Sequence, residues 1–248
     1  MAEPDHGPGG AEGTGSRRWF SPGLERMGAA CAAWAIEQTE AYNAYHPAAE
    51  WHVDIEACTF RQGSITVRMA PLGTFGTDGS WVWAWANPHM HPPGSERLSL
   101  SLDLRRIGEE RDVPELVTPR LELSEFADAR MALERLLLAS TGTVAGRGYG
   151  SVTAGTGARI AMVMVDEAIP RAGFDLVTLP RRIMQGIEVF PHDPRATVSG
   201  YLERHGAAVE TAPDGGLRGV RGDHAVSAAF DEYGRLTDLS VANADTAV

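Results

Sequence analysis

Three tryptophans in one short stretch are the residues with the clearest chemical potential. Trp81, Trp83 and Trp85 alternate with small residues, and the stretch ends at Asn87. If it is a strand, a period of two places all three indoles on one face. Such a row is typical of a platform for a sugar, a flat ligand or a partner's side chain, and equally of a core strand packed beneath helices. The first interpretation makes these four residues candidate ligand- or partner-binding residues, whereas the second leaves Asn87 to bond the local backbone.

A His-x-His pair, His89 and His91, follows directly. Such a pair can bind a metal, but zinc needs three or four ligands with supporting contacts. The chain has neither HExxH nor paired CxxC spacing, so we expect no metal and no cofactor. The alternative to a binding role is an enzyme, specifically a hydrolase that uses carboxylates and histidine near His89 and His91. That alternative requires a pocket that brings these histidines beside an acid.

Other common catalytic motifs are not found. The glycines of the Gly-rich stretch 142–157 do not follow G-x-G-x-x-G, and Ser151 does not lie in a G-x-S-x-G elbow. All 22 basic residues are arginine. Chemistry that needs a Schiff-base or P-loop lysine is therefore excluded, and with it pyridoxal-phosphate enzymes, Walker-type nucleotidases and standard kinases.

The elements that must position these residues are a mixture of helices and strands. Ser21 and Pro22 predict a helix start, and we expect helices at 22–45 and 125–141, the second ended by Gly142. Alternating or apolar runs predict these strands: 51–57, 64–72, 80–87 and 159–168. We therefore predict an α+β fold, in which a mainly antiparallel sheet is covered by two or three helices.

Composition divides the chain into four parts. Residues 1–17 are rich in Gly, Pro and acid, and we expect a disordered tail. Residues 18–168 form the main α+β domain, and 169–180 form a proline-bounded linker. The predicted helix 193–206 and the hairpin signals after it make 181–248 a small C-terminal α+β module.

Charge and targeting signals bear on partners and location. The net charge of −11 repels nucleic acid and anionic membranes, so we expect neither as a partner. We find no secretory h-region and no run of ~18 apolar residues that could span a membrane. With Cys31 and Cys58 expected as reduced thiols, we predict a cytoplasmic protein.

The tryptophan stretch also carries a family resemblance. The pattern G-T-F, then W-V-W-A-W-A-N-P, a charged stretch, V-P-E-L and an acidic helix resembles an uncharacterised bacterial family of unknown function that is common in actinobacteria. The resemblance covers roughly 24–166. It implies a shared fold and supports a helix over the ambiguous stretch that begins near Gly94, where alternating leucines would also allow a strand. It implies no activity and no catalytic residue.

The favoured hypothesis is a non-enzymatic binding protein. It would act through an unknown protein partner or a small molecule, in an immunity or regulatory role. Acidic proteins are often steered toward basic partners by complementary charge, which is compatible with this hypothesis.

Overall fold

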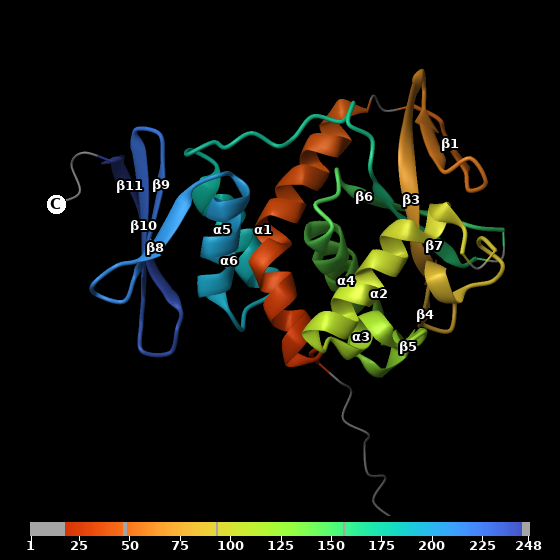
Figure 1. Ribbon diagram of the computed structural model, residues 1–248, viewed down its shortest axis with the longest axis horizontal. Coiled ribbons are helices and arrows are strands. Elements are labelled where there is room, and N and C mark those ends of the chain that lie inside the picture. Colours follow the sequence, from red (N-terminus) through yellow and green to blue (C-terminus); the bar gives the residue numbers. More distant parts are fainter. Residues whose placement is uncertain (1–17, 47–48, 93, 156, 245–248) are drawn as a thin grey trace, which may run out of the picture.

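The longest helix of the protein, α1 (Pro22–Tyr45), runs through the middle of the molecule (Figure 1). The computed structural model describes residues 18–46, 49–92, 94–155 and 157–244. The Ser21 hydroxyl caps α1 by accepting a hydrogen bond from the Leu24 amide, and Pro22 occupies the first turn, as predicted. Because α1 is buried on several sides, it can serve as a packing surface for the elements on both flanks. The predicted tail, 1–17, lies outside the described residues.

A seven-stranded sheet lies on one side of α1, and all its pairings are antiparallel. The chain path through it is a meander from β1 to β5, and β7 pairs with both β3 and β6. Its strands are β1 (Trp51–Asp54), β2 (Thr59–Gln62), β3 (Ile65–Phe75), β4 (Ser80–Trp83), β5 (Arg120–Glu122), β6 (Tyr149–Thr153) and β7 (Arg159–Met164). The predicted strand 51–57 is wrong in length, because the chain turns after Asp54 and returns as β2.

Three helices accompany this sheet: α2 (Ser99–Arg111), α3 (Pro114–Val117) and α4 (Ala129–Thr143). The helix favoured over the leucine-rich stretch is thus confirmed as α2. Helix α4 starts later than predicted, because Asp128 caps it by accepting from the amides of Arg130 and Met131. It also continues through Gly142, where a Cβ would overlap the Cys31 side chain of α1. Gly142 therefore permits close helix packing rather than ending the helix.

The C-terminal part adds two helices and a second antiparallel sheet on the opposite side of α1 (Figure 1). The helices are α5 (Leu179–Val189) and α6 (Pro194–Arg204), and the strands, in the order β11-β10-β9-β8, are β8 (Ala208–Thr211), β9 (Leu217–Arg221), β10 (His224–Phe230) and β11 (Leu236–Asn243). Helix α6 and the hairpin tail are confirmed, whereas α5 was not predicted. The α+β fold is confirmed.

One apolar core joins the two parts of the chain. It contains Leu24 of α1, Leu136 of α4 and Trp83 of β4, and it continues to Leu202 of α6 and Val226 of β10. The larger of two hydrophobic clusters thus contains residues from both sides of the predicted domain boundary at 181. Whether 181–248 behaves as a separate module stays a prediction.

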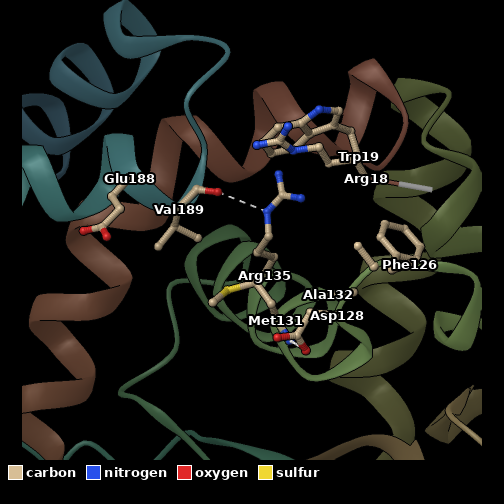
Figure 2. A pocket seen from close by; sticks show the side chains of 10 residues that line it. Arg18, Trp19, Phe126, Asp128, Met131, Ala132, Arg135, Glu188 and Val189 are labelled. Carbon is tan, nitrogen blue, oxygen red and sulfur yellow. Dashed lines mark hydrogen bonds between the residues drawn. The ribbon is translucent and has the colours of Figure 1, made fainter. Parts of the chain in front are cut away.

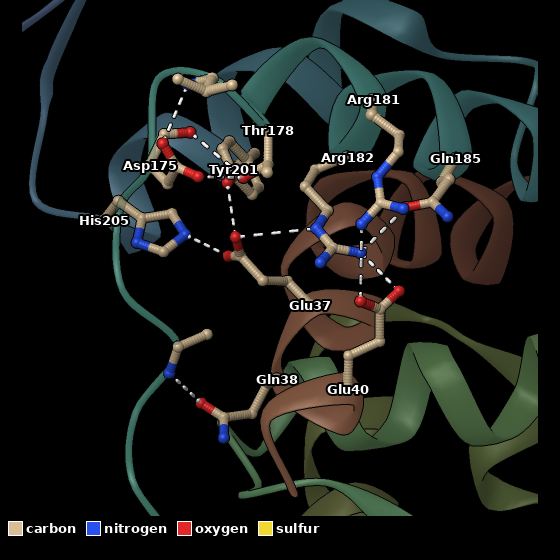
Figure 3. A network of polar contacts seen from close by, with 12 residues as sticks. Glu37, Gln38, Glu40, Asp175, Thr178, Arg181, Arg182, Gln185, Tyr201 and His205 are labelled. Carbon is tan, nitrogen blue, oxygen red and sulfur yellow. Dashed lines mark hydrogen bonds and ion pairs between the residues drawn. The ribbon is translucent and has the colours of Figure 1, made fainter. Parts of the chain in front are cut away.

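A polar network reinforces the contact between α1 and the C-terminal helices (Figure 3). Glu37 of α1 accepts a hydrogen bond from the Tyr201 hydroxyl at 3.0 Å and lies 2.7 Å from His205 Nε2. Arg182 of α5 pairs with Glu40 of α1 at 2.5 Å. Because Glu37 and Tyr201 are buried, these bonds fix how α6 lies on α1.

Across the described residues, no helix is both long enough and apolar enough to cross a membrane.

Candidate functional site

The tryptophan stretch is not a single strand. Strand β4 ends at Trp83, and Ala84–Ala86 form a turn of 3₁₀ helix. Trp81 and Trp83 lie on one face of β4, with ring centroids 5.4 Å apart in an edge-to-face arrangement. Trp85 leaves that face because the chain has already turned. The prediction of one strand over 80–87 is therefore wrong beyond Trp83.

Trp81 and Trp83 belong to the core, and both side chains are fully buried. The Trp83 indole donates a hydrogen bond to the Glu115 carbonyl at 2.9 Å, which links it to the V-P-E-L segment. Gly73 pairs with Trp83 across β3 and β4, and a Cβ at Gly73 would overlap the Trp81 indole. The G-T-F and W-V-W parts of the motif are thus explained by packing. The burial supports the core interpretation for these two indoles.

Trp85 and Asn87 lie at the rim of this cluster and are half-buried. The guanidinium of Arg105 from α2 lies 4.7 Å from the centre of a Trp85 ring. Asn87 accepts from the His89 amide at 3.1 Å, which is local bonding, and donates to the Thr74 hydroxyl of β3 at 3.3 Å. Ligand binding by Trp81, Trp83, Trp85 and Asn87 stays a prediction.

The two histidines of the NPHMHPP stretch lie in different surroundings. His89 is exposed, whereas His91 is buried with its Nε2 3.7 Å from Cys58 Sγ. Burial raises the pKa of the Cys58 thiol, which favours the protonated form over the nucleophilic thiolate. In the described ranges, no three His, Cys, Asp or Glu side chains gather as a metal site. The hydrolase hypothesis for this loop stays a prediction.

A first pocket, of about 340 Å³, lies between the start of the described chain and α4 (Figure 2). Its walls are largely apolar, with Trp19, Phe126 and Met131 among them, and the guanidinium of Arg135 points into it. That guanidinium is already engaged, because it pairs with buried Glu25 and donates to the Val189 carbonyl at 3.0 Å. Arg135 therefore serves to hold α1, α4 and α5 together, and this pocket is a weaker candidate for ligand binding.

A second pocket, of about 400 Å³, combines aromatic and polar walls at the C-terminal end of α1. Tyr42 of α1, His46 directly after it, Phe60 of β2 and the exposed Trp51 of β1 contribute rings, and residues 149–153 of β6 also line the pocket. Met162 and Met164 of β7 also line it. More of the exposed wall is polar than apolar, so a ligand held here would need hydrogen-bonding groups as well as a flat ring.

The polar feature that distinguishes this pocket is the ring of His46. Its side chain is 8% exposed, and its Nδ1 lies 3.3 Å from the Tyr42 carbonyl oxygen. A carbonyl only accepts, so Nδ1 carries the proton and Nε2 is an acceptor in the neutral ring. Among the described residues this buried Nε2 has no hydrogen-bond partner. A buried acceptor without a partner costs free energy that a bound donor would recover.

The Gly-rich stretch shapes the same pocket. Gly148 has a φ of +127°, and a Cβ there would come within 2.7 Å of the Tyr42 Cβ. Only glycine fits such an approach without strain. The stretch continues as the edge strand β6, so its glycines bring the sheet against α1 rather than cradling a phosphate. Sequence reasoning missed this site because its residues come from five separate segments. The one signal in the sequence was Gly148 in the Gly-rich stretch.

The fold and the pocket define an α+β protein with two antiparallel sheets and an open, ligand-sized cavity beside its central helix. A comparison with protein families matches residues 25–168 to DUF6882, a family of unknown function. Because this match covers more than half of the chain, the protein belongs to that family. The predicted membership of an uncharacterised family is thereby confirmed, while the bacterial origin and the tryptophan motif stay predictions. No curated protein and no solved structure matches the chain.

Proposed function

We propose that the protein is a non-enzymatic binding protein for a small, neutral aromatic molecule, held in the pocket at the C-terminal end of α1. The observation that carries this proposal is the buried acceptor His46 Nε2, which lacks a partner among the described residues at the wall of an aromatic pocket. The ligand would stack on the exposed Trp51 and donate one N–H or O–H to His46 Nε2, which has almost no exposed surface, so binding requires the wall around it to move.

The surroundings of His46 support a neutral ligand. Tyr42 and Phe60 lie edge-on to the His46 ring, with centroids 4.8 and 5.9 Å away. Arg159 donates to the Ser151 hydroxyl at 2.6 Å, and among the described residues that line the pocket none is an arginine, an aspartate or a glutamate. The thioethers of Met162 and Met164 add polarizable, apolar surface that suits an aromatic ring. An uncharged heteroaromatic compound with one donor fits these walls.

The test uses ligand-observed NMR with a set of neutral aromatic amides, including benzamide and nicotinamide. We expect at least one compound to bind the wild-type protein with millimolar or better affinity. His46→Phe keeps a ring but removes the acceptor, and Trp51→Ala removes the stacking surface. Each substitution should weaken binding by about tenfold, since a hydrogen bond or aromatic contact contributes about 1–1.5 kcal/mol.

Tyr233→Ala is the matched control, because Tyr233 is an exposed aromatic residue, 75% exposed, outside the pocket. It should leave binding unchanged. Failure of the whole set to bind, or binding that survives both pocket substitutions, would contradict the proposal.

A further inference from the structure

Two arginines from distant parts of the sequence lie over the same indole. Arg171, between β7 and α5, and Arg204, the last residue of α6, place their guanidinium carbons 5.6 and 4.9 Å from the Trp34 ring centre. Together with Ala145, Ala172 and His205, they line a pocket of about 340 Å³. A third arginine, Arg147, lies near them. Burial lowers the pKa of Arg171, and the positive charges of Arg147 and Arg204 lower it further.

The positive charge gathered here is not balanced by neighbouring acids. Within the described ranges, Arg147, Arg171 and Arg204 form no salt bridge, whereas nine other arginines do. Glu167 acts on Arg171 only through space. Glu37, which contacts the His205 ring, is already bonded to that ring and to the Tyr201 hydroxyl. In a protein of net charge −11, an uncompensated cationic pocket is a specific local feature.

The backbone holds these arginines in place. Gln38 of α1 donates to the Pro170 carbonyl at 3.0 Å and accepts from the Ala172 amide at 3.1 Å, so it fixes the chain on both sides of Arg171. Arg171 itself donates to the Ala145 carbonyl at 2.9 Å. The pocket is therefore organised before any ligand arrives, which lowers the entropic cost of binding.

Hydrogen bonds within the protein use only some of the N–H donors of these three arginines. A guanidinium has five N–H donors. Arg147 and Arg171 each donate one N–H to a backbone carbonyl. Arg204 forms no hydrogen bond in the part of the chain that the structure describes. Arg204 also suits the end of α6, where a cation stabilises the helix dipole. The helix dipole accounts for the position of Arg204. It does not explain why Arg171 and Arg147 lie close to Arg204.

We propose that the pocket over Trp34 binds a small polyanion through Arg171 and Arg204, with phosphate or carboxylate as the recognised group. Planar guanidinium groups bind such oxyanions through paired, charge-assisted hydrogen bonds. The amides of Ala145, Gly146 and Arg147 already donate to backbone carbonyls, so side chains and not the Gly-rich loop hold the anion. A long polyanion such as nucleic acid would meet the negative field of the rest of the surface.

This site is separate from the aromatic pocket. Trp34 lies in the middle of α1, whereas Tyr42 and His46 lie at its C-terminal end, and the two sites favour ligands of opposite character. Binding of a polyanion can therefore be present or lost independently of the proposed aromatic ligand.

Isothermal titration calorimetry of the full chain with pyrophosphate, and separately with citrate, at low ionic strength tests this proposal. We expect at least one of them to bind with 1:1 stoichiometry. Arg171→Gln and Arg204→Gln should each raise the Kd by about tenfold, the effect of losing a charge-assisted hydrogen bond. Tighter binding of pyrophosphate would identify phosphate as the recognised group, and tighter binding of citrate would identify carboxylate.

Arg235→Gln is the matched control, because Arg235 is also an exposed arginine over an aromatic ring, 5.1 Å from the Tyr233 centroid. It removes the same charge outside the pocket and should change the Kd by less than about twofold if the effect is local. The proposal is overturned if neither anion binds the wild-type protein, or if all three variants weaken binding equally, since that would show a general charge effect.

Discussion

At the scale of single residues, the best-defined interaction is the buried pair of Glu25 and Arg135. Both side chains are almost fully buried, and they join α1 to α4. Glu25 also accepts the Phe20 amide at 2.9 Å, and the Arg135 guanidinium lies 4.8 Å from the Phe190 ring centre. Breaking a pair of this kind is destabilising mainly because the remaining charge is then buried without a partner and without water.

Substitution of Arg135 should therefore be strongly destabilising. Arg135→Met keeps much of the apolar stem but leaves Glu25 buried without its cation, and we expect a loss of about 3–5 kcal/mol in the free energy of unfolding. Adding Glu25→Gln to this variant should restore part of the loss, because the uncompensated charge is then removed. Urea denaturation of the wild type, both single variants and the double variant measures the coupling. Additive losses would show that the two charges do not depend on each other.

Residue-level prediction from the sequence succeeded where chemistry is local. Asn87 bonds neighbouring backbone as its position at a turn suggested, and Ser21 caps α1. The candidate pockets could not be predicted in the same way. His46, at the end of α1, meets Phe60 of β2, and Arg171 meets Arg204 only after α5 and α6 fold back on α1. Such sites depend on tertiary contacts that no spacing in the sequence reports.

At the scale of elements, packing overrode local preference at several points. Trp81 and Trp83 alternate as strand residues do, but the strand stops there and Trp85 enters a 3₁₀ turn. Helix α5 begins with Leu179 and Pro180, and its apolar residues pack on α1 although two arginines interrupt the stretch. Gly200 within α6 shows the same principle, since a Cβ there would overlap the Ala30 carbonyl oxygen of α1.

Gly200→Ala separates packing from helix propensity. Alanine favours a helix interior over glycine by about 1 kcal/mol, so propensity alone predicts stabilisation. We expect the opposite, a loss of about 1–3 kcal/mol or more, because the added methyl group must push α6 away from α1. Thermal denaturation followed by circular dichroism measures the sign. Gly173→Ala is the control, since a Cβ at Gly173 would have nothing within 4 Å, and it should be neutral or slightly stabilising.

At the scale of the whole molecule, the central question is whether the C-terminal part unfolds with the rest. The apolar core runs from β4 through α1 to α6 and β10, and the Glu37 network crosses the same contact (Figure 3). Sequence composition suggested a boundary because prolines flank residues 169–180, yet composition cannot show which face of α1 the following helices cover. The shared core predicts one cooperative unit.

The tryptophans make this prediction testable. All six, from Trp19 to Trp85, lie before the predicted linker, but Trp19 contacts His192 and Trp34 lies beneath Arg204. The test therefore uses a background with Trp19→Phe and Trp34→Phe, in which fluorescence reports on the N-terminal part of the chain. Leu202 of α6 is fully buried, and Leu202→Ala should cost about 2–5 kcal/mol. If the two parts unfold together, this substitution must lower the urea midpoint measured by fluorescence as much as the midpoint measured by circular dichroism. Tyr233→Ala, at an exposed position, should shift neither midpoint. A fluorescence midpoint that stays at the wild-type value would mean that residues 181–248 unfold on their own, and the contacts across α1 would then join two separate domains.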